Sequence, residues 1–166
     1  IGEFFIYNYL KQDMIELPLG ISFACNMSNN YYHFMLQVAS RFHLLSLIKL
    51  DKNIPIIVDE GVLKIPQMRE VIEALNVDNR EIISIKANQR YRVGKLYIIS
   101  EPNVIVPNSS SKNKQRTENF AFDRNTIDYI STTLSERINP CTENYPKRVF
   151  LSRKGCNKRR CNENEL

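Results

Sequence analysis

Cysteine and histidine are scarce in this chain, which has four cysteines and two histidines among 166 residues. The cysteines are Cys25, Cys141, Cys156 and Cys161. They are too few and too scattered for a disulfide framework, and they favour free thiols in a reducing compartment. Because only His33 and His43 could join them, their spacing argues against a zinc site, and we expect no bound metal.

Long apolar segments are also absent. No run reaches the roughly 18 residues that a membrane-spanning helix needs, and no secretory leader is recognisable. The chain begins at Ile1 rather than at a methionine, and its last residues read as the start of a helix. We therefore expect a piece of a longer protein, with no membrane segment within the piece.

What the chain does have is the composition of a globular domain. Hydrophobic residues make up 43% and charged residues 25%, so one domain with a core can form at this length. The net charge is +5, and much of it comes from residues 147–160. This excess of positive charge marks a local site rather than a generally basic protein.

Short apolar segments alternate between the patterns of strands and helices. Strands are expected at residues 4–7, 21–24, 54–59 and 82–85, with a bent strand or a hairpin at 91–99, and helices at 30–49, 66–75 and 124–137. Residues 59–61 read as a turn and residues 100–121 as a long loop. This alternation predicts an α/β domain with a mainly parallel, Rossmann-like sheet.

The helix expected at residues 124–137 has clear start and stop signals. Either Asp123 or Asn125 can cap its N-terminus, and Asn139–Pro140 ends it. Its helical period predicts four inward-facing residues, namely Ile127, Ile130, Leu134 and Ile138.

The helix expected at residues 30–49 carries a polar edge beside its apolar face. The apolar stripe consists of Phe34, Val38, Phe42 and Leu45. His33, Gln37 and Arg41 follow one another at intervals of four, which places them one above another on one edge. Plain solvent exposure explains such an edge equally well. The functional alternative is that His33 takes a proton from a substrate hydroxyl, because imidazole exchanges protons near neutral pH.

The last nineteen residues, 148–166, read as a strand, a basic loop and a helix start. The apolar run 149–151 follows a turn, and Asn162 can cap the helix that begins after it. The loop holds five cations, namely Arg153, Lys154, Lys158, Arg159 and Arg160. Ligands bind at the carboxyl ends of strands in open α/β sheets, and arginine suits a diphosphate because of its bidentate hydrogen bonds.

Two other interpretations of the basic loop stay open. It can be a solvated, flexible loop, as charge runs usually are. It can also contact nucleic acid, which needs cations as well. No aromatic residue lies among the cations, so a platform for stacking single-stranded bases is not supported.

Two segments of the chain resemble signatures of glycosyltransferase family 61. The segments 150–153 (FLSR), 159–160 (RR) and 162–166 (NENEL) are similar to the family's "SR…R…NE-x-E" pattern. Upstream, the segment 30–36 (NYYHFML) is similar to its "N-Y-x-H-F/W" helix. Two motifs in this order are far more specific than either alone, and the stretch between them matches in pattern only.

The resemblance implies a GT-B arrangement, in which two α/β domains face each other across the active site. Residues 1–138 would form the N-terminal, acceptor-side domain, residues 139–147 a linker, and residues 148–166 the beginning of the donor domain. It further implies transfer of a sugar, with inversion, from a nucleotide-sugar donor to a hydroxyl of a glycan or polysaccharide acceptor. Neither a metal nor another cofactor is implied, because cations stabilise the leaving diphosphate.

The resemblance also implies roles for individual residues. His33 is the catalytic candidate. The donor diphosphate would be bound by Ser152, Arg153, Arg159 and Arg160, the donor nucleotide by Asn162, Glu163 and Glu165, and the cleft would be supported by Asn30, Gln37 and Arg41. For the two glutamates, a simple interaction with the helix dipole is an equally good explanation.

This chain departs from the family in two ways. The family often has an acidic residue where this chain has Gln37, and an amide cannot act as a base. A later "H-G-A" segment of the donor domain does not occur here. We therefore expect the 166-residue chain to be inactive by itself.

Two further function classes remain as alternatives. One is a nucleic-acid-binding module that uses the cations of residues 153–160, and the other is a non-catalytic remnant of the same fold. The abundance of Asn, Lys and Ile is typical of an AT-rich genome, and with the free thiols it favours a bacterial cytoplasmic enzyme of polysaccharide assembly. A Golgi-lumen enzyme is the second choice.

Overall fold

The computed structural model describes residues 13–103 and 121–138. The predictions for residues 1–12, 104–120 and 139–166 lie outside the described residues. They include the apolar run 4–7, most of the long loop, the linker, and the whole basic segment with its helix start.

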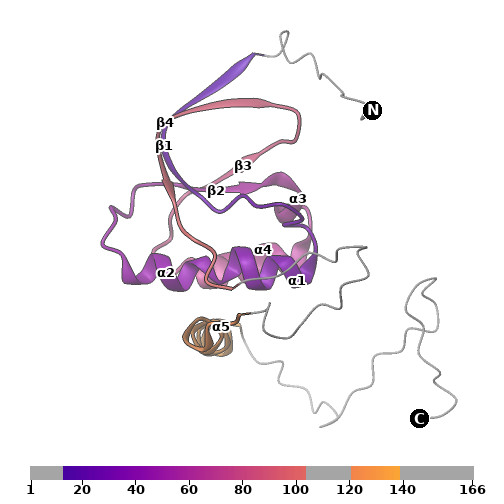
Figure 1. Ribbon diagram of the computed structural model, residues 1–166, viewed down its shortest axis with the longest axis vertical. Coiled ribbons are helices and arrows are strands. Elements are labelled where there is room, and N and C mark those ends of the chain that lie inside the picture. Colours follow the sequence, from indigo (N-terminus) through magenta and orange to yellow (C-terminus); the bar gives the residue numbers. More distant parts are fainter. Residues whose placement is uncertain (1–12, 104–120, 139–166) are drawn as a thin grey trace, which may run out of the picture.

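The described chain is built on a sheet of four parallel strands. These are β1 (Met14–Ser22), β2 (Ile56–Asp59), β3 (Ile82–Ile85) and β4 (Arg90–Ile98), in the order β3-β2-β1-β4 (Figure 1). All three strand pairs are parallel. The predicted parallel α/β sheet is therefore confirmed.

Helices connect the first three strands. They are α1 (Tyr31–His33), the π-helix η1 (Phe34–Ala39), α2 (Arg41–Leu47), α3 (Glu60–Leu63) and α4 (Pro66–Leu75), and α5 (Arg124–Arg137) follows the sheet. From β1 to β3 the chain moves in one direction across the sheet, so right-handed crossovers place the connecting helices on one face. Figure 1 shows α1, α2 and α4 below the sheet, α3 beside the end of β2, and α5 on the outer side of the helix layer.

The core fills the space between the sheet and this helix layer. Its fully buried side chains include Ile21, Ile56 and Val58 from the sheet, Phe34 and Val38 from η1, and Met68, Ile72 and Leu75 from α4. The rings of Phe23 and Phe42 meet edge to face, with their centroids 4.9 Å apart. Burial of each such side chain contributes about 1.5–3 kcal/mol.

The first halves of β1 and β4 leave the sheet as a two-stranded ribbon. The two strands pair from Met14 and Arg90 onwards, whereas β2 pairs with β1 only at Ile21 and Ser22. Figure 1 shows the ribbon on the side of the sheet opposite the helix layer. A parallel pair normally needs a helical crossover of a dozen or more residues. Here no helix connects β3 to β4, and the first half of β4 carries the chain back from the carboxyl end of β3 to β1.

Several predicted boundaries were wrong. β1 begins at Met14, well before the expected strand 21–24. Proline normally argues against a strand, but the pairing of β1 with β4 skips Pro18, so β1 continues through it. The segment 91–99 is one bent strand. Residues 59–61 belong partly to α3 rather than to a turn, and β2 begins at Ile56. The bounds of α4 and β3 are those predicted.

The two longer helices needed other corrections. The helix expected at 30–49 ends at Leu47 and is interrupted by η1. For α5, the bounds and the Asp123 cap were confirmed, since the Asp123 side chain accepts from the Thr126 backbone N–H. Its inward face was partly wrong. Ile130 is buried and Leu134 is partly buried, as predicted, whereas Ile127 and Ile138 are more than 40% exposed and Thr126 and Thr133 are buried in their place. The reason is that α5 packs mainly against α2 and α4, so only the side of α5 that faces these two helices is buried.

We predict that Gly94→Ala destabilises the fold. A Cβ atom at Gly94 would lie 2.6 Å from the backbone oxygen of Pro18, so the ribbon would have to open where it bends. We expect the free energy of unfolding to fall by about 1–3 kcal/mol in urea denaturation. Gly61→Ala is the control, since its Cβ would lie 3.6 Å from Asn29, an ordinary contact. Equal stabilities of the two variants would contradict the steric argument.

Candidate functional site

The candidate site lies at the carboxyl ends of β1 and β4. The chain leaves β1 toward β2 on one side, and β4 occupies the other side, so the strand order reverses between β1 and β4. Such a reversal is where open α/β sheets bind ligands, outside the carboxyl ends of the strands. The helix that follows β1 brings His33, Gln37 and Arg41 there, and Glu101 arrives three residues after the end of β4.

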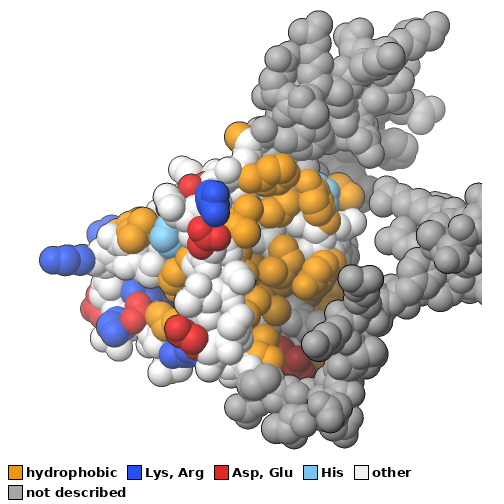
Figure 2. All heavy atoms as spheres, turned by 90° about the horizontal axis from the view of Figure 1, so that it is seen from below, with side chains coloured by type: hydrophobic (Ala, Val, Ile, Leu, Met, Phe, Trp, Pro, Cys, Tyr) orange, Lys and Arg blue, Asp and Glu red, His pale blue; other side chains and the backbone are white. Residues whose placement is uncertain are grey.

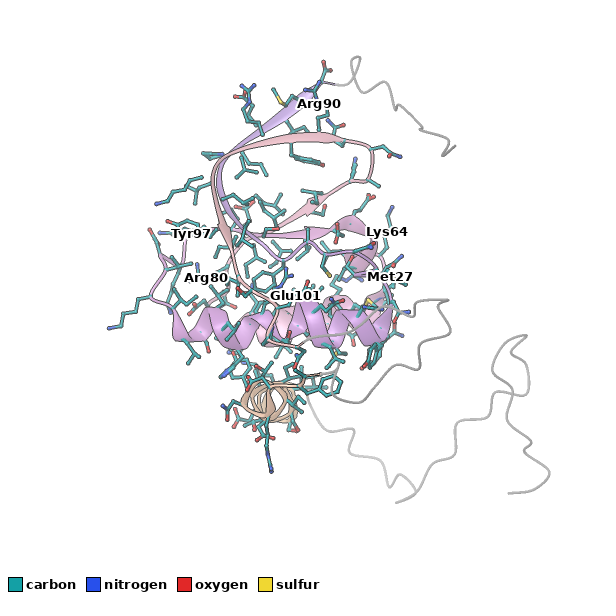
Figure 3. All side chains as sticks on the ribbon, in the orientation of Figure 1. Met27, Lys64, Arg80, Arg90, Tyr97 and Glu101 are labelled. Atoms are coloured by element: carbon teal, nitrogen blue, oxygen red, sulfur yellow. The ribbon has the colours of Figure 1, made fainter. Side chains whose placement is uncertain are left out.

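Four side chains form one continuous hydrogen-bonded chain. His33 Nδ1 lies 2.7 Å from Gln37 Oε1, and Gln37 Nε2 donates to Glu101 Oε2 over 2.7 Å. The other carboxylate oxygen, Glu101 Oε1, accepts from Arg41 Nη2 at 2.8 Å. Figure 3 labels Glu101 at the helix layer, just below the sheet. The three residues of the predicted polar edge therefore lie on one side of the helix, and Glu101, from a distant part of the chain, links them.

This chain of bonds determines which nitrogen of His33 carries the proton in the neutral ring. An ionised carboxylate only accepts hydrogen bonds, so Glu101 requires the NH₂ group of Gln37 to point toward it. The carbonyl oxygen of Gln37 then faces His33 and can only accept. His33 must donate from Nδ1, and in the neutral ring Nε2 carries the lone pair.

Arg41 anchors the arrangement from inside the fold. Its side chain is only 6% exposed, and its Nη1 atom lies 3.5 Å from the carbonyl oxygens of Ser22 and Ala24 at the end of β1. A buried guanidinium is costly unless a carboxylate compensates its charge, and Glu101 does so. The ion pair therefore joins the helix to the ends of both strands.

The π-helix η1 lies between His33 and Arg41 and has its own support. The carbonyl oxygen of Leu36 accepts two side-chain hydrogen bonds, from Ser40 Oγ at 2.6 Å and from Asn103 Nδ2 at 2.9 Å. Asn103 is fully buried, and its Oδ1 accepts from the Asp123 backbone N–H. Single turns of π-helix are rare and recur at functional sites. The segment after β4 thus supplies both Glu101 and the clamp on the π-turn.

Asn30 has a supporting role. Its side-chain oxygen accepts from the Tyr32 backbone N–H at 3.0 Å, which caps the helix that carries His33. The remaining predicted site residues, Ser152, Arg153, Arg159, Arg160, Asn162, Glu163 and Glu165, lie outside the described residues. Whether His33 and Arg153 face one cleft therefore stays a prediction.

Sequence reasoning missed Glu101 and Asn103. Both were assigned to the long loop after β4, where polar residues are unremarkable. One signal was available, since the polar edge of His33, Gln37 and Arg41 contains a cation and no carboxylate to compensate it.

Hydrophobic surface surrounds the start of the helix. Met27, Tyr31 and Tyr32 are all about half exposed. The Tyr32 ring stands edge-on to the His33 ring, with the centroids 5.9 Å apart. On the face seen in Figure 2, hydrophobic side chains gather toward the end where α1 lies in Figure 1.

Comparisons with known proteins add no assignment. No protein-family model, no curated protein and no solved structure matches this chain. Within residues 13–103 and 121–138, no cluster of three potential metal ligands occurs. None of the described helices has the length and hydrophobicity to cross a membrane.

We predict that Cys25, which follows β1, reacts slowly with alkylating reagents. Burial raises the pKa of its thiol from 9.0 to about 11; Arg41 opposes this shift, and the Glu101 and Asp59 carboxylates add to it. At pH 8 the thiolate fraction, and with it the rate of iodoacetamide labelling, should be on the order of 100-fold below that of an unperturbed thiol. Peptide mass spectrometry would follow this site alone. The rate should keep rising with pH toward 11, and a plateau near pH 9 would contradict the shift.

We predict that Gln37→Leu changes the protonated nitrogen of His33. Without the amide oxygen, Nδ1–H loses its acceptor, so the ring should move toward the Nε2–H tautomer. Nitrogen-15 NMR of the imidazole side chain would detect this change. His43, whose ring packs against Tyr129, is an internal reference that should keep its signals. An unchanged His33 spectrum would show that Gln37 does not set the tautomer.

Proposed function

We propose that this chain forms the acceptor-side half of an inverting, GT-B-type glycosyltransferase, similar to family 61, that acts in glycan or polysaccharide synthesis. The observation that supports it most is the position of His33. This residue stands in the segment that resembles the family's helix motif, at the reversal of strand order, and its Nε2 atom carries the lone pair that can accept a proton.

In the proposed reaction, His33 Nε2 takes the proton of an acceptor hydroxyl. The hydroxyl oxygen then forms a bond to the anomeric carbon of the donor, while the bond from that carbon to the diphosphate oxygen breaks. Attack from the opposite side inverts the configuration. The diphosphate leaves with the electron pair of the broken bond, and Ser152, Arg153, Arg159 and Arg160 would stabilise its charge.

Glu101 and Gln37 would act by positioning His33. The protonated imidazole that forms during transfer carries a positive charge, and the Glu101 carboxylate is linked to it through one amide. This arrangement gives Gln37 a role that does not require it to be a base. The carboxylate that the family motif often holds at this position is supplied here from the segment after β4.

The test uses the protein that carries this chain together with the donor domain that the resemblance implies. Transfer from UDP-, GDP- and CDP-sugars is followed by release of the nucleoside diphosphate. His33→Ala should lower kcat by about 10²–10⁴-fold, because a general base is lost. Glu101→Gln should lower kcat less. His43→Ala is the matched control and should transfer normally.

Nucleotide binding separates a catalytic defect from a structural one. Calorimetric titration of nucleoside diphosphates should give the same affinity for the wild-type protein and for His33→Ala. Arg153→Ala should weaken binding by more than about 1.5 kcal/mol, as expected when a charge-assisted hydrogen bond is lost. A His33→Ala protein with the wild-type kcat would refute the proposed base. The 166-residue chain alone should show no transfer.

A further inference from the structure

A second feature at the same edge of the sheet is a pocket of about 600 Å³ at the carboxyl ends of β1, β2 and β3. Three segments line it, residues 25–29 after β1, residues 59–61 with Lys64 around α3, and residues 85–87 at the end of β3. Figure 3 shows Met27 and Lys64 together at this end of the molecule. Its volume is in the range of pockets for small ligands. The first lining segment leads within a few residues to His33.

The walls of the pocket are held in place by hydrogen bonds. The Cys25 backbone N–H donates to Asp59 Oδ2 at 3.3 Å, which ties the first wall to the second. The Asn30 backbone N–H donates to the Met27 carbonyl oxygen at 2.9 Å and closes the first wall into a tight turn. The pocket is therefore a defined part of the fold.

The lining combines hydrogen-bond donors and acceptors. Asp59 and Glu60 provide carboxylates, Lys64 and Lys86 ammonium groups, and Asn26 and Asn29 amides. Glu60 and Lys64 are already paired, at 2.9 Å. A site for a metal cation would present acceptors only, and a phosphate site mainly donors. A hydroxyl group both donates and accepts, so a lining of mixed character suits a ligand with several hydroxyls.

The pocket also has apolar surface. Met27, which is about half exposed, joins Ile85 and Ala87 in the lining. A sugar ring has polar edges and C–H groups on its faces, and these two kinds of surface match the two kinds of lining. Because cationic and anionic side chains are equally represented, a neutral sugar fits better than a charged one.

We propose that this pocket binds a neutral sugar, and that this sugar belongs to the acceptor. The second part of the proposal rests on the proposed function. A sugar seated between the three strand ends would lie beside the helix that begins at Tyr31 and carries His33. His33 does not line the pocket, so the hydroxyl that it deprotonates would belong to the part of the acceptor that extends from the pocket toward this helix.

The experiment is an NMR titration of the complete nitrogen-15-labelled chain with methyl glycosides of glucose, galactose, mannose and N-acetylglucosamine. Backbone amides of residues 25–29, 59–61 and 85–87 should shift with one of them in a saturable way. Lys86→Ala should raise the Kd at least tenfold. Lys95→Ala is the matched control, since this lysine lies on β4 over the Tyr97 ring, and it should leave the Kd unchanged. Inorganic phosphate and Ca²⁺ serve as competing probes.

The outcomes separate the pocket from the proposed function. Saturable shifts elsewhere in the chain, no shifts at all, or shifts caused by phosphate or Ca²⁺ but not by glycosides would each overturn the pocket assignment. If glycosides bind as expected but the larger protein transfers no sugar, the proposed function fails and the pocket stands as a sugar-binding site. If transfer occurs and Lys86→Ala keeps the acceptor KM, the pocket assignment fails alone.

Discussion

One ion pair, between the buried guanidinium of Arg41 and the carboxylate of Glu101, ties the helix after β1 to the segment after β4. Arg41 lies inside the fold at the end of β1, and burial of its guanidinium is tolerable only with a carboxylate beside it. Glu101 supplies that carboxylate from the segment after β4. The ion pair thus holds the segment after β4 against the end of β1, where the strand order reverses.

The candidate chemistry follows from the same constraint. Once Glu101 is held by Arg41, its second oxygen orients the Gln37 amide, and the amide orients the His33 ring. A structural ion pair and a proton-accepting nitrogen are therefore parts of one network. The neighbouring pocket uses the loops at the same sheet edge but depends on different residues, mainly those that follow β2 and β3. The network and the pocket can therefore be altered separately.

Local signals predicted some elements well and others not at all. Pro66 at the first helical position and the apolar run 82–85 were sufficient for α4 and β3, because those signals act within the element itself. The first half of β1 was not predicted because it contains Pro18, and a strand accommodates this proline only where its pairing with β4 skips the residue. Glu101 was missed for the same kind of reason. It meets Arg41 across 60 positions in the chain, and no local pattern records such a contact. The basic segment 148–166 lies outside the described residues, so its role as a diphosphate-binding loop stays a prediction from the sequence.

The π-helix η1 determines how the helix that carries His33 and Arg41 responds to the insertion or deletion of a residue. A π-turn holds one residue more than an α-turn, so it is equivalent to a single-residue insertion in a regular helix. An extra residue in a regular α-helix would rotate everything after it by about 100°, and the wider π-turn absorbs that rotation. Removal of one residue between Phe34 and Ala39 would therefore restore a regular α-helix and leave Arg41 on the side of the helix that His33 occupies. A relative of this protein with a one-residue deletion in this turn would thus keep its buried cation in register with its histidine.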